Sequence, residues 1–427
     1  MKHIFRHYLH RAFKPRRYAI LRQMLARQRW NRAQLAQYQQ KRLQYMIALA
    51  REHTDFYARK YADVALDAPL EAYPILTKAE VRAQGRAMVN RQLAPRRIKT
   101  AHTGGSTGQP LTYYYTEEKT EIMRAGMMRS YQWSGWRPGQ GIVNFWGARQ
   151  DLSAPARGLA RLRRWSAAEL TLPAYEFAEP EMQEWYWRIQ AFRPVLLQGY
   201  ASVLARFARY LQQQGWRLPP LAGVYTTAEV LYPAQRRLMQ EVFACPVYNQ
   251  YGCREAPNLA VECRHGRMHI LSDGVIMESV EIQGRQQLLV TSLTDTTMPF
   301  IRYQLGDSGR LLEESCDCGL PFPLMEINIC RSNDLIQTPS GRWVYPAYFI
   351  HLLDGYSAIQ HFQWRQISAS ALLLQLVSRQ PLSREQSDLL SRRIRRELDG
   401  MQLRIQYPEA ISPTASGKHR FVIGLEA

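Results

Sequence analysis

Between about residue 117 and residue 330, short apolar runs alternate with stretches that have helical periodicity. The clearest runs are 141–146, 195–197, 221–225 and 246–250. Because neighbouring parallel strands need a long crossover connection, this alternation predicts an α/β fold with a parallel sheet. Between residues 275 and 313 the runs follow one another directly, which is typical of an antiparallel sheet or a distorted β-barrel.

The 427 residues are enough for two or three domains. Residues 1–60 read as a basic helical segment in which Pro15 is the only strong helix breaker. Residues 61–330 form the predicted large α/β domain. After residue 331 a compact α+β pattern begins and continues to residue 427. We therefore expect a small C-terminal domain there.

The net charge of +20 is concentrated at the N-terminus, since residues 1–50 hold twelve Lys or Arg and no Asp or Glu. Apolar and aromatic residues are interleaved with these cations. Such a segment can pack on its own protein, lie on an anionic membrane surface or bind nucleic acid, and we favour the first two. No run has the roughly 18 apolar residues that a membrane helix needs, and no secretory signal is evident. We expect a cytoplasmic protein, with peripheral contact to the inner face of the membrane as a further option.

Four short motifs have the residue types that nucleotide chemistry needs. TGGSTGQP (103–110) combines glycines with hydroxyls that can donate to phosphate oxygens, although it lacks the lysine of a Walker A loop. In YGCRE (251–255), Glu255 follows a predicted strand and could hold Mg²⁺. In RYQLGD (302–307), Asp307 could accept the hydroxyls of a ribose. In the C-terminal SGK (416–418), Lys418 could neutralise developing negative charge. Each motif alone is equally compatible with an ordinary loop.

The order of these motifs resembles that of the adenylate-forming superfamily, with TTAE (226–229) and RSND (331–334) completing the series. The finer similarity is to the phenylacetate–CoA ligase branch and its CapK-like members, which are linked to capsular polysaccharide genes. The segments that support it are GYAS (199–202), ECRHG (262–266), MPFIRYQLGD (298–307) and CDCG (316–319). This resemblance covers roughly residues 40–427.

The resemblance implies a role for each matching residue. The phosphate-binding loop would comprise Thr103, Gly104, Gly105, Ser106, Thr107 and Gly108. The rest of the nucleotide site would comprise Glu229, Tyr251, Gly252 and Asp307. Catalysis would involve Lys418, Glu255 as the Mg²⁺ ligand, and Arg302. The hinge of a mobile C-terminal domain would contain Arg331, Asn333 and Asp334.

Three positions depart from the family pattern. Gln109 replaces a common lysine, Thr226–Thr227 replaces a Ser/Gly pair, and Cys330 replaces the glycine before the hinge arginine. Because Lys418, Glu255 and Asp307 are all present, we still expect an active enzyme. The departures leave the shape of the acid pocket and the binding of pyrophosphate open.

Cysteine and histidine spacing predicts a separate metal site. Cys263 and His265 form one short pair, and Cys316 and Cys318 form another. Three thiols and one imidazole suit a tetrahedral structural Zn²⁺. If His265 points away, His269 is the expected substitute. Four unrelated thiol and imidazole groups remain the alternative, although similar pairs occur in the related branch.

The predicted function is activation of a small carboxylic acid, with an aromatic acid as one candidate, by ATP to an acyl-adenylate, followed by transfer to CoA with release of AMP. An alternative keeps the first step and passes the acyl group to a carrier-protein thiol, an amine or a sugar in surface-polysaccharide or secondary-metabolite assembly. A third possibility is a non-catalytic binding protein on the same scaffold. A homodimer is compatible with all three.

Overall fold

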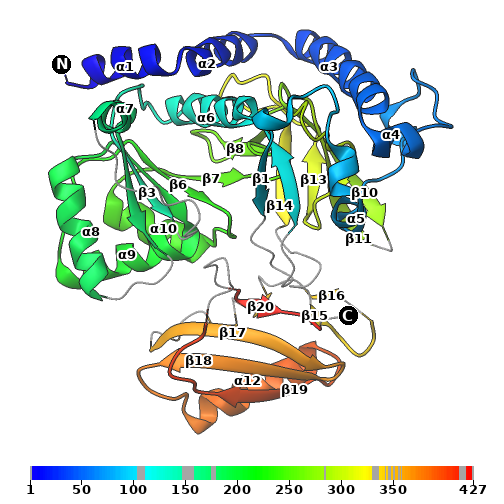
Figure 1. Ribbon diagram of the computed structural model, residues 1–427. Coiled ribbons are helices and arrows are strands. Elements are labelled where there is room, and N and C mark those ends of the chain that lie inside the picture. Colours follow the sequence, from blue (N-terminus) through cyan, green and yellow to red (C-terminus); the bar gives the residue numbers. More distant parts are fainter. Residues whose placement is uncertain are drawn as a thin grey trace. The chain divides into compact units, whose positions relative to one another are not determined.

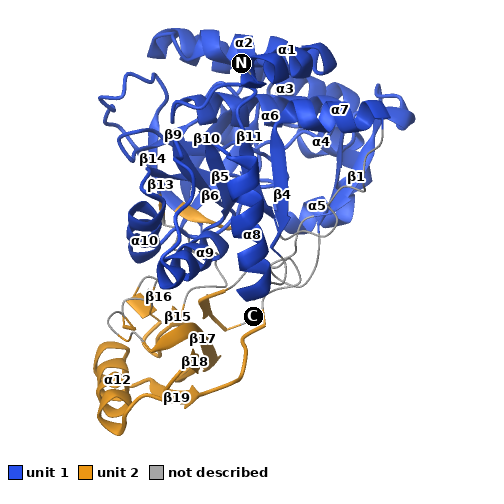
Figure 2. Cartoon of the chain, turned by 90° about the vertical axis from the view of Figure 1, so that its left-hand side faces the viewer, with its two compact units in different colours: residues 1–305, 309–326 blue, residues 306–308, 327–427 orange. Residues whose placement is uncertain are grey.

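The computed structural model divides the chain into two compact units, one of residues 1–305 and 309–326 and one of residues 306–308 and 327–427 (Figures 1 and 2). Each unit is considered by itself below. The structure describes residues 2–102, 111–146, 158–174, 179–282, 285–328, 336–341, 343–344, 348–349, 352–353, 356, 358–412 and 420–425.

A nine-stranded sheet forms the centre of the first unit, in the order β13-β14-β9-β8-β7-β6-β5-β3-β4. Five neighbouring strands pair in parallel, which confirms the predicted α/β fold. These strands are β4 (Glu169–Pro173), β3 (Ile142–Trp146), β5 (Leu196–Tyr200), β6 (Gly223–Thr227) and β7 (Val247–Tyr251). The sheet continues with the antiparallel β8 (Ala260–Glu262), β9 (Met268–Ile270) and β14 (Leu324–Asn328), and ends with β13 (Ser308–Leu312).

Helices cover both faces of the parallel strands because successive strand residues point to opposite sides. On one face, Leu197 and Val224 pack with residues of α8 (Glu179–Phe192), α9 (Ala201–Gln214) and α10 (Pro233–Phe243). On the other face, Leu196 and Tyr225 pack with α6 (Glu117–Gln132) and with helices from the N-terminus. The first unit is therefore a layered α/β/α structure.

Antiparallel strands lie beside this layered structure, where the consecutive apolar runs predicted them. A three-stranded sheet contains β10 (Val275–Ile282), β11 (Arg285–Ser292) and β12 (Tyr303–Gln304). A hairpin of β1 (Lys99–His102) and β2 (Thr112–Tyr115) flanks the glycine-rich motif. Short helical segments connect this region to the N-terminus: η1 (Leu70–Ala72), α5 (Lys78–Gln84), η2 (Gly85–Met88) and η3 (Pro95–Arg97).

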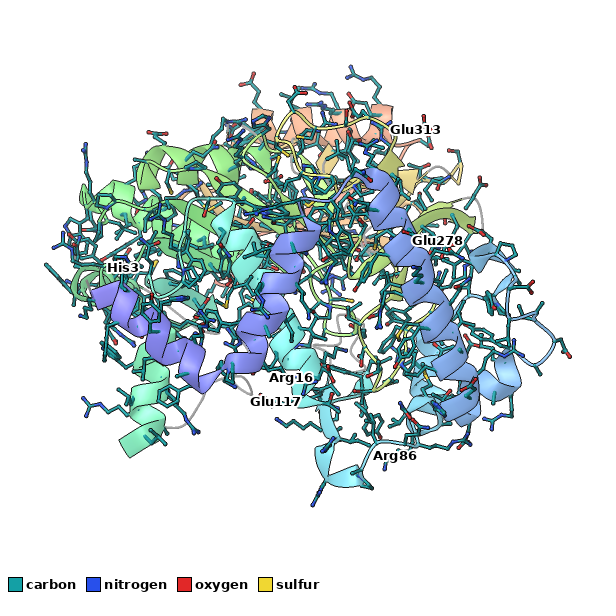
Figure 3. The ribbon with its side chains drawn as sticks, turned by 90° about the horizontal axis from the view of Figure 1, so that it is seen from above. His3, Arg16, Arg86, Glu117, Glu278 and Glu313 are labelled. Atoms are coloured by element: carbon teal, nitrogen blue, oxygen red, sulfur yellow. The ribbon has the colours of Figure 1, made fainter. Side chains whose placement is uncertain are left out.

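The basic N-terminus forms four helices, α1 (Lys2–Phe13), α2 (Pro15–Arg27), α3 (Arg32–His53) and α4 (Asp55–Lys60) (Figure 3). Tyr18, Leu21 and Met24 of α2 are buried in the core beneath. Arg17 and Lys14 both bind the buried Glu121 of α6, each at 2.8 Å. Burial by itself would raise the pKa of Glu121, but the hydrogen bonds from these two cations lower it below its ordinary value. Helix α2 therefore packs on the protein's own core, which was the first of the three alternatives for the basic N-terminal segment. Among the described helices, none is long and apolar enough to cross a membrane.

Asp273 joins three parts of the first unit through one carboxylate. Its Oδ2 accepts hydrogen bonds from Arg27 of α2 at 2.9 Å and from Arg129 of α6 at 2.8 Å. Asp273 and Arg129 are almost completely buried. Because a buried guanidinium without its counter-charge is costly, this carboxylate is required for α2 and α6 to pack together.

The second unit has a four-stranded sheet in the order β19-β18-β17-β20. Trp364, Leu374 and Ile394 are central to its own hydrophobic core, which confirms the predicted C-terminal α+β unit. Ser383 begins α12 with a capping box to Gln386. The elements are β15 (Ile336–Gln337), β16 (Trp343–Val344), β17 (Ile359–Ser368), β18 (Ala371–Ser378), α12 (Arg384–Glu397), β19 (Gln402–Gln406) and β20 (Val422–Ile423).

Replacing Asp273 by alanine should lower the free energy of unfolding by about 3–5 kcal/mol, because it leaves the buried Arg129 unpaired. Urea denaturation measures the effect. The control is Glu118→Gln, which breaks the solvent-exposed pair with Arg16 and should cost less than about 1 kcal/mol. Equal losses for both variants would contradict the role assigned to Asp273.

Candidate active site and metal centre

Three of the predicted motifs leave the sheet at the same edge. GYAS begins with the last two residues of β5, TTAE with the last two of β6 and YGCRE with the last residue of β7, and these strands are neighbours. The register places Tyr200 opposite Thr227 and Thr227 opposite Gln250. In open α/β sheets, ligands bind outside the carboxyl ends of the strands. The fold therefore gathers the motifs at the edge where a nucleotide site is expected.

Gly199 allows two of these strands to approach closely. A Cβ atom at this position would lie 2.8 Å from Cβ of Phe145 and 3.0 Å from its carbonyl oxygen, on the adjacent β3. The next residue, Tyr200, stacks on Trp146 with ring centroids 5.3 Å apart. Aromatic side chains thus stand at the carboxyl ends of both β3 and β5.

Glu229 links the TTAE and GYAS motifs directly. Its Oε2 accepts a hydrogen bond of 2.8 Å from the backbone N–H of Ser202, in the first turn of α9. A carboxylate is favoured at a helix N-terminus because it satisfies an unpaired N–H and complements the helix dipole. The contact in the structure is therefore a helix cap, and the predicted nucleotide contact of Glu229 stays a prediction.

Glu255 is buried at the junction of two motifs. The hydroxyl of Tyr303, in the RYQLGD segment, donates to its Oε1 at 3.0 Å, and Lys119 Nζ donates to its backbone carbonyl at 2.7 Å. Burial, together with the nearby carboxylate, raises the pKa of Tyr303, so its hydroxyl keeps its proton. A buried carboxylate of this kind fits the oxygen chemistry of Mg²⁺, which commonly keeps other oxygen ligands from water and phosphate.

Tyr251 and Gly252 form a tight exit from β7. The carbonyl of Tyr251 accepts from the N–H of Leu259 at 3.0 Å. A Cβ on Gly252 would lie 3.2 Å from the N atom of Asn258, so a larger residue would push the returning chain away. The Sγ of Cys253 accepts from the N–H of Ala256 at 3.2 Å. The motif is therefore a compact turn that carries Glu255.

Arg302 has a structural environment. Its guanidinium binds Glu278 through two nitrogen atoms, and its third nitrogen donates to the carbonyls of Glu71 and Tyr73, both at 2.7 Å. All three nitrogens are thus used to join β10 to the segment around η1. Its backbone also has a positive φ of 48°, which is uncommon for a residue with a side chain. These contacts give Arg302 a structural role in the first unit, and its predicted catalytic role stays a prediction.

Asp307 follows Gly306, whose φ of 79° makes the turn between β12 and β13. Several other predicted site residues lie outside the described residues and keep their assignments only as predictions. These are Thr103, Gly104, Gly105, Ser106, Thr107, Gly108, Gln109, Cys330, Arg331, Asn333, Asp334 and Lys418.

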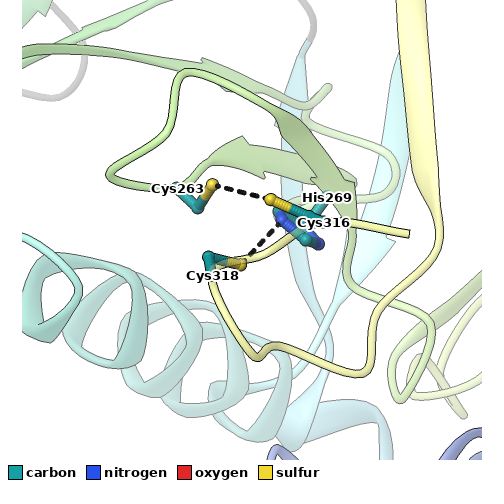
Figure 4. A group of neighbouring side chains, drawn as sticks. All are labelled: Cys263, His269, Cys316 and Cys318. Carbon is teal, nitrogen blue, oxygen red and sulfur yellow. Dashed lines mark hydrogen bonds between the residues drawn. The ribbon is translucent and has the colours of Figure 1, made fainter. Parts of the chain in front are cut away.

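The predicted metal ligands come together, with one change (Figure 4). Ligand atoms of Cys263, His269, Cys316 and Cys318 all lie within 4.8 Å of one another. His265, the ligand we predicted first, is exposed and does not join them. The alternative, His269, takes its place because it lies on β9, which pairs antiparallel with β8, and Cys263 directly follows β8. A chain turn at Gly266, with φ of 69°, separates the two histidines.

The distances in this group match those between the ligands of a tetrahedral zinc site. The sulfur atoms of Cys263 and Cys316 are 3.7 Å apart, and Cys318 Sγ is 3.3 Å from His269 Nε2. Zn–S bonds of about 2.3 Å at the tetrahedral angle place two sulfurs about 3.8 Å apart. His269 Nδ1 donates to the carbonyl of Phe322 at 2.9 Å, which leaves Nε2 as the lone-pair atom facing the thiols.

Electrostatics in the group also suit a cation. Burial and the neighbouring cysteines raise the pKa of the Cys318 thiol. Burial lowers the pKa of His269, so its imidazole is neutral near pH 7. A divalent cation would stabilise the thiolate forms and bind the neutral imidazole. These residues therefore fit a structural metal ion.

Two site contacts escaped the sequence reasoning. Tyr303 stands next to Arg302 in a motif that we recognised, but its bond to Glu255 depends on residues 48 positions apart. The Glu229 bond to Ser202 likewise joins two motifs through the strand order. The only sequence signal for the first contact was the position of Tyr303 inside a predicted motif.

Comparison with solved structures shows that the fold is that of adenylate-forming ligases. The chain superposes on 2-hydroxyisobutyryl-CoA ligase in the postadenylation state, bound to R3-HIB-AMP, with a TM-score of 0.73 and 17% identity over 94% of this chain and 91% of that one. The same ligase with 2-HIB-AMP and CoA in the thioesterification state gives a TM-score of 0.60 and 18% identity, over 93% and 91% of the two chains.

Sequence comparison is more specific. Residues 336–424 match the family model of the CapK C-terminal domain. The protein CapK of Staphylococcus aureus is 25% identical over 280 residues, which cover 64% of this chain and 61% of CapK. Phenylacetate-coenzyme A ligase of Thermus thermophilus is 26% identical over 340 residues, or 74% of each chain. The resemblance inferred from the motifs is confirmed.

Metal analysis of the purified protein should find about one zinc per chain. His269→Ala should remove it, because the imidazole completes the ligand set, and the protein should become easier to unfold. His265→Ala is the matched control and should keep the metal. Equal zinc content in the two variants, or none in the wild type, would contradict the site.

Proposed function

We propose that the protein activates a small carboxylic acid with ATP and then transfers the acyl group to a thiol. The observation that carries this proposal is the meeting of GYAS, TTAE and YGCRE at the carboxyl ends of β5, β6 and β7. The likeness to ligases solved with acyl-adenylates supports it. So does the similarity to phenylacetate-coenzyme A ligase.

In the first step, a carboxylate oxygen of the acid attacks the α-phosphorus of ATP, and the bond to the leaving pyrophosphate breaks. Two anions must approach each other, so catalysis depends on positioning and on charge neutralisation. Lys418 would bind the carboxylate and α-phosphate, and the hydroxyls of Ser106 and Thr107 would bind the outer phosphates. Asp307 would accept the ribose hydroxyls, and Tyr251 would stack near the adenine.

Two metal ions belong to the proposal. Glu255 would hold Mg²⁺, which supplies positive charge at the phosphates when it is bound. Tyr303 would keep the Glu255 side chain in place through its hydrogen bond. Zn²⁺ held by Cys263, His269, Cys316 and Cys318 would be structural, since these four ligands fill a tetrahedral shell. It would hold the segment after β13 to the β8–β9 turn.

In the second step, a thiolate attacks the acyl carbonyl and the bond to AMP breaks. CoA is the proposed donor of this thiol, in line with the CoA ligases among the relatives. The CapK match over residues 336–424 is compatible with the alternative acceptors, a carrier-protein thiol, an amine or a sugar. Between the steps, the C-terminal domain would turn about residues 331–334, with Arg331, Asn333 and Asp334 at the hinge.

Acid-dependent exchange of pyrophosphate into ATP should occur with at least one member of a carboxylic-acid panel. Lys418→Ala and Glu255→Gln should each lower its rate by about 100- to 1,000-fold, because each removes charge stabilisation from the reacting phosphate. The control, Lys41→Ala on α3, removes an exposed cation and should leave the rate unchanged. Full exchange by Lys418→Ala, or no exchange by folded wild type that binds ATP, would count against adenylation.

Adding CoA to the active acid and ATP should release AMP stoichiometrically with a thioester, which mass spectrometry detects. Exchange that continues while CoA yields no thioester would reject CoA as the acceptor and leave the adenylation step intact. In that case, acyl transfer to a carrier-protein thiol, an amine or a sugar would be tested with the same acid.

A further inference from the structure

Helix α1 leaves large apolar residues exposed and turns some of its polar residues toward the protein. Ile4, Phe5 and Tyr8 are 50%, 62% and 64% exposed. By contrast, His10 is buried against Tyr18, with Nδ1 and the hydroxyl 3.0 Å apart, and Arg6 lies over the ring of Trp165 at 4.8 Å. A helix that only covers the protein's own core would have the opposite arrangement.

Helix α7 (Gly158–Ala167) lies against α1 and extends the same kind of surface. Phe5 contacts Trp165 of α7 with ring centroids 6.0 Å apart, and Arg163 lies 5.4 Å from the ring centre of Phe13. Leu159 and Leu162 of α7 are 58% and 42% exposed. We call the exposed residues of the two adjoining helices the α1–α7 face: Ile4, Phe5, Tyr8, Leu159 and Leu162, with the exposed cations Lys2, Arg11 and Arg161.

The α1–α7 face is held by the fold. Gly139, with φ of 90°, lies so close to α1 that a Cβ there would come within 2.1 Å of the carbonyl oxygen of His3. Figure 3 shows His3 at the start of α1, over the first unit. The outward position of Ile4, Phe5 and Tyr8 is thus set by backbone contact on the opposite side of the helix.

The face is exclusively cationic. Neither α1 nor α7 contains an Asp or a Glu. Further along, Lys14 before α2 and Arg17 and Arg27 of α2 pair with the buried carboxylates of Glu121 and Asp273. Lys2, Arg11 and Arg161 remain exposed beside the apolar residues. Large apolar side chains rimmed by cations are what an anionic bilayer interface accommodates.

We propose that the α1–α7 face docks the protein on an anionic lipid bilayer. This assigns the membrane contact expected of residues 1–50 to α1 and adds α7, a helix more than 100 residues away in the chain. A second copy of the chain would bring cations against cations on a self-complementary interface. Nucleic acid phosphates would pair with the arginines but would leave Ile4, Leu159 and Leu162 in water. An anionic bilayer interface accommodates both the apolar side chains and the cations.

Co-sedimentation of the full chain with vesicles tests the proposal. We expect binding to vesicles of 70% phosphatidylcholine and 30% phosphatidylglycerol, and at least tenfold weaker binding to phosphatidylcholine alone. The double variant Ile4→Ser with Phe5→Ser should weaken binding to the anionic vesicles by tenfold or more. Arg11→Gln with Arg161→Gln should weaken it by a comparable factor, because each cation near the surface contributes about fivefold.

Each double variant has a matched control in another part of the chain. Ile367→Ser with Leu389→Ser removes two exposed apolar residues of the second unit, and Lys41→Gln with Arg59→Gln removes two exposed cations from α3 and α4. Both controls should change binding by less than about twofold. Equal losses in variants and controls would overturn the α1–α7 face as the docking surface.

Other results would overturn the proposal in distinguishable ways. Absence of binding to anionic vesicles would reject membrane docking altogether. A dimer in ultracentrifugation that Ile4→Ser with Phe5→Ser dissociates would assign the face to a second copy, and DNA binding lost in the same variant would assign it to nucleic acid. Pyrophosphate exchange without vesicles is measured in parallel. Because it does not depend on the α1–α7 face, its failure concerns the proposed function alone.

Discussion

Parallel hydrogen bonding between β5, β6 and β7 is the constraint on which the candidate active site depends. Parallel neighbours place their carboxyl ends at one edge of the sheet, so the residues that follow each strand become neighbours although they lie about 25 positions apart in the chain. Gly199 permits the close approach to β3, and Glu229 caps α9 across the same edge. Moving one strand by a single residue would turn its motif side chains to the other face.

Buried charges hold the layers around this sheet. Asp273 joins α2 to α6, Glu121 joins α2 to α6 a second time, and Arg302 joins β10 to the segment around η1. The cations of the basic N-terminus therefore fall into two groups. Lys14, Arg17 and Arg27 pair with the buried carboxylates of Glu121 and Asp273, whereas Lys2 and Arg11 of α1 stay at the surface with Ile4, Phe5 and Tyr8. Net charge alone could not distinguish the paired cations from the exposed ones, because it depends on composition and not on which side of a helix faces the core.

Prediction from sequence succeeded where the signal was local and periodic. The alternating runs between residues 117 and 330 gave the parallel sheet, and the change of pattern near 275 gave antiparallel strands. Motif order led to the adenylate-forming fold. It specified individual side chains less closely: the binding of Arg302 to Glu278 was not predicted, and the histidine beside the thiols is the substitute, His269, instead of His265. Both differences arise from which way a side chain points after a turn, which neighbouring residues in the sequence do not specify.

The sequence by itself determined the fold class, the order of the nucleotide motifs and the presence of three cysteines and a histidine that can bind a metal. Each of these depends only on residue types and their spacing. Only the tertiary structure decided that Tyr303 supports Glu255, that β9 brings His269 to the thiols, and that α7 lies beside α1. These contacts join residues that are far apart in the chain. Strand order and helix packing, which depend on the whole fold, bring them together.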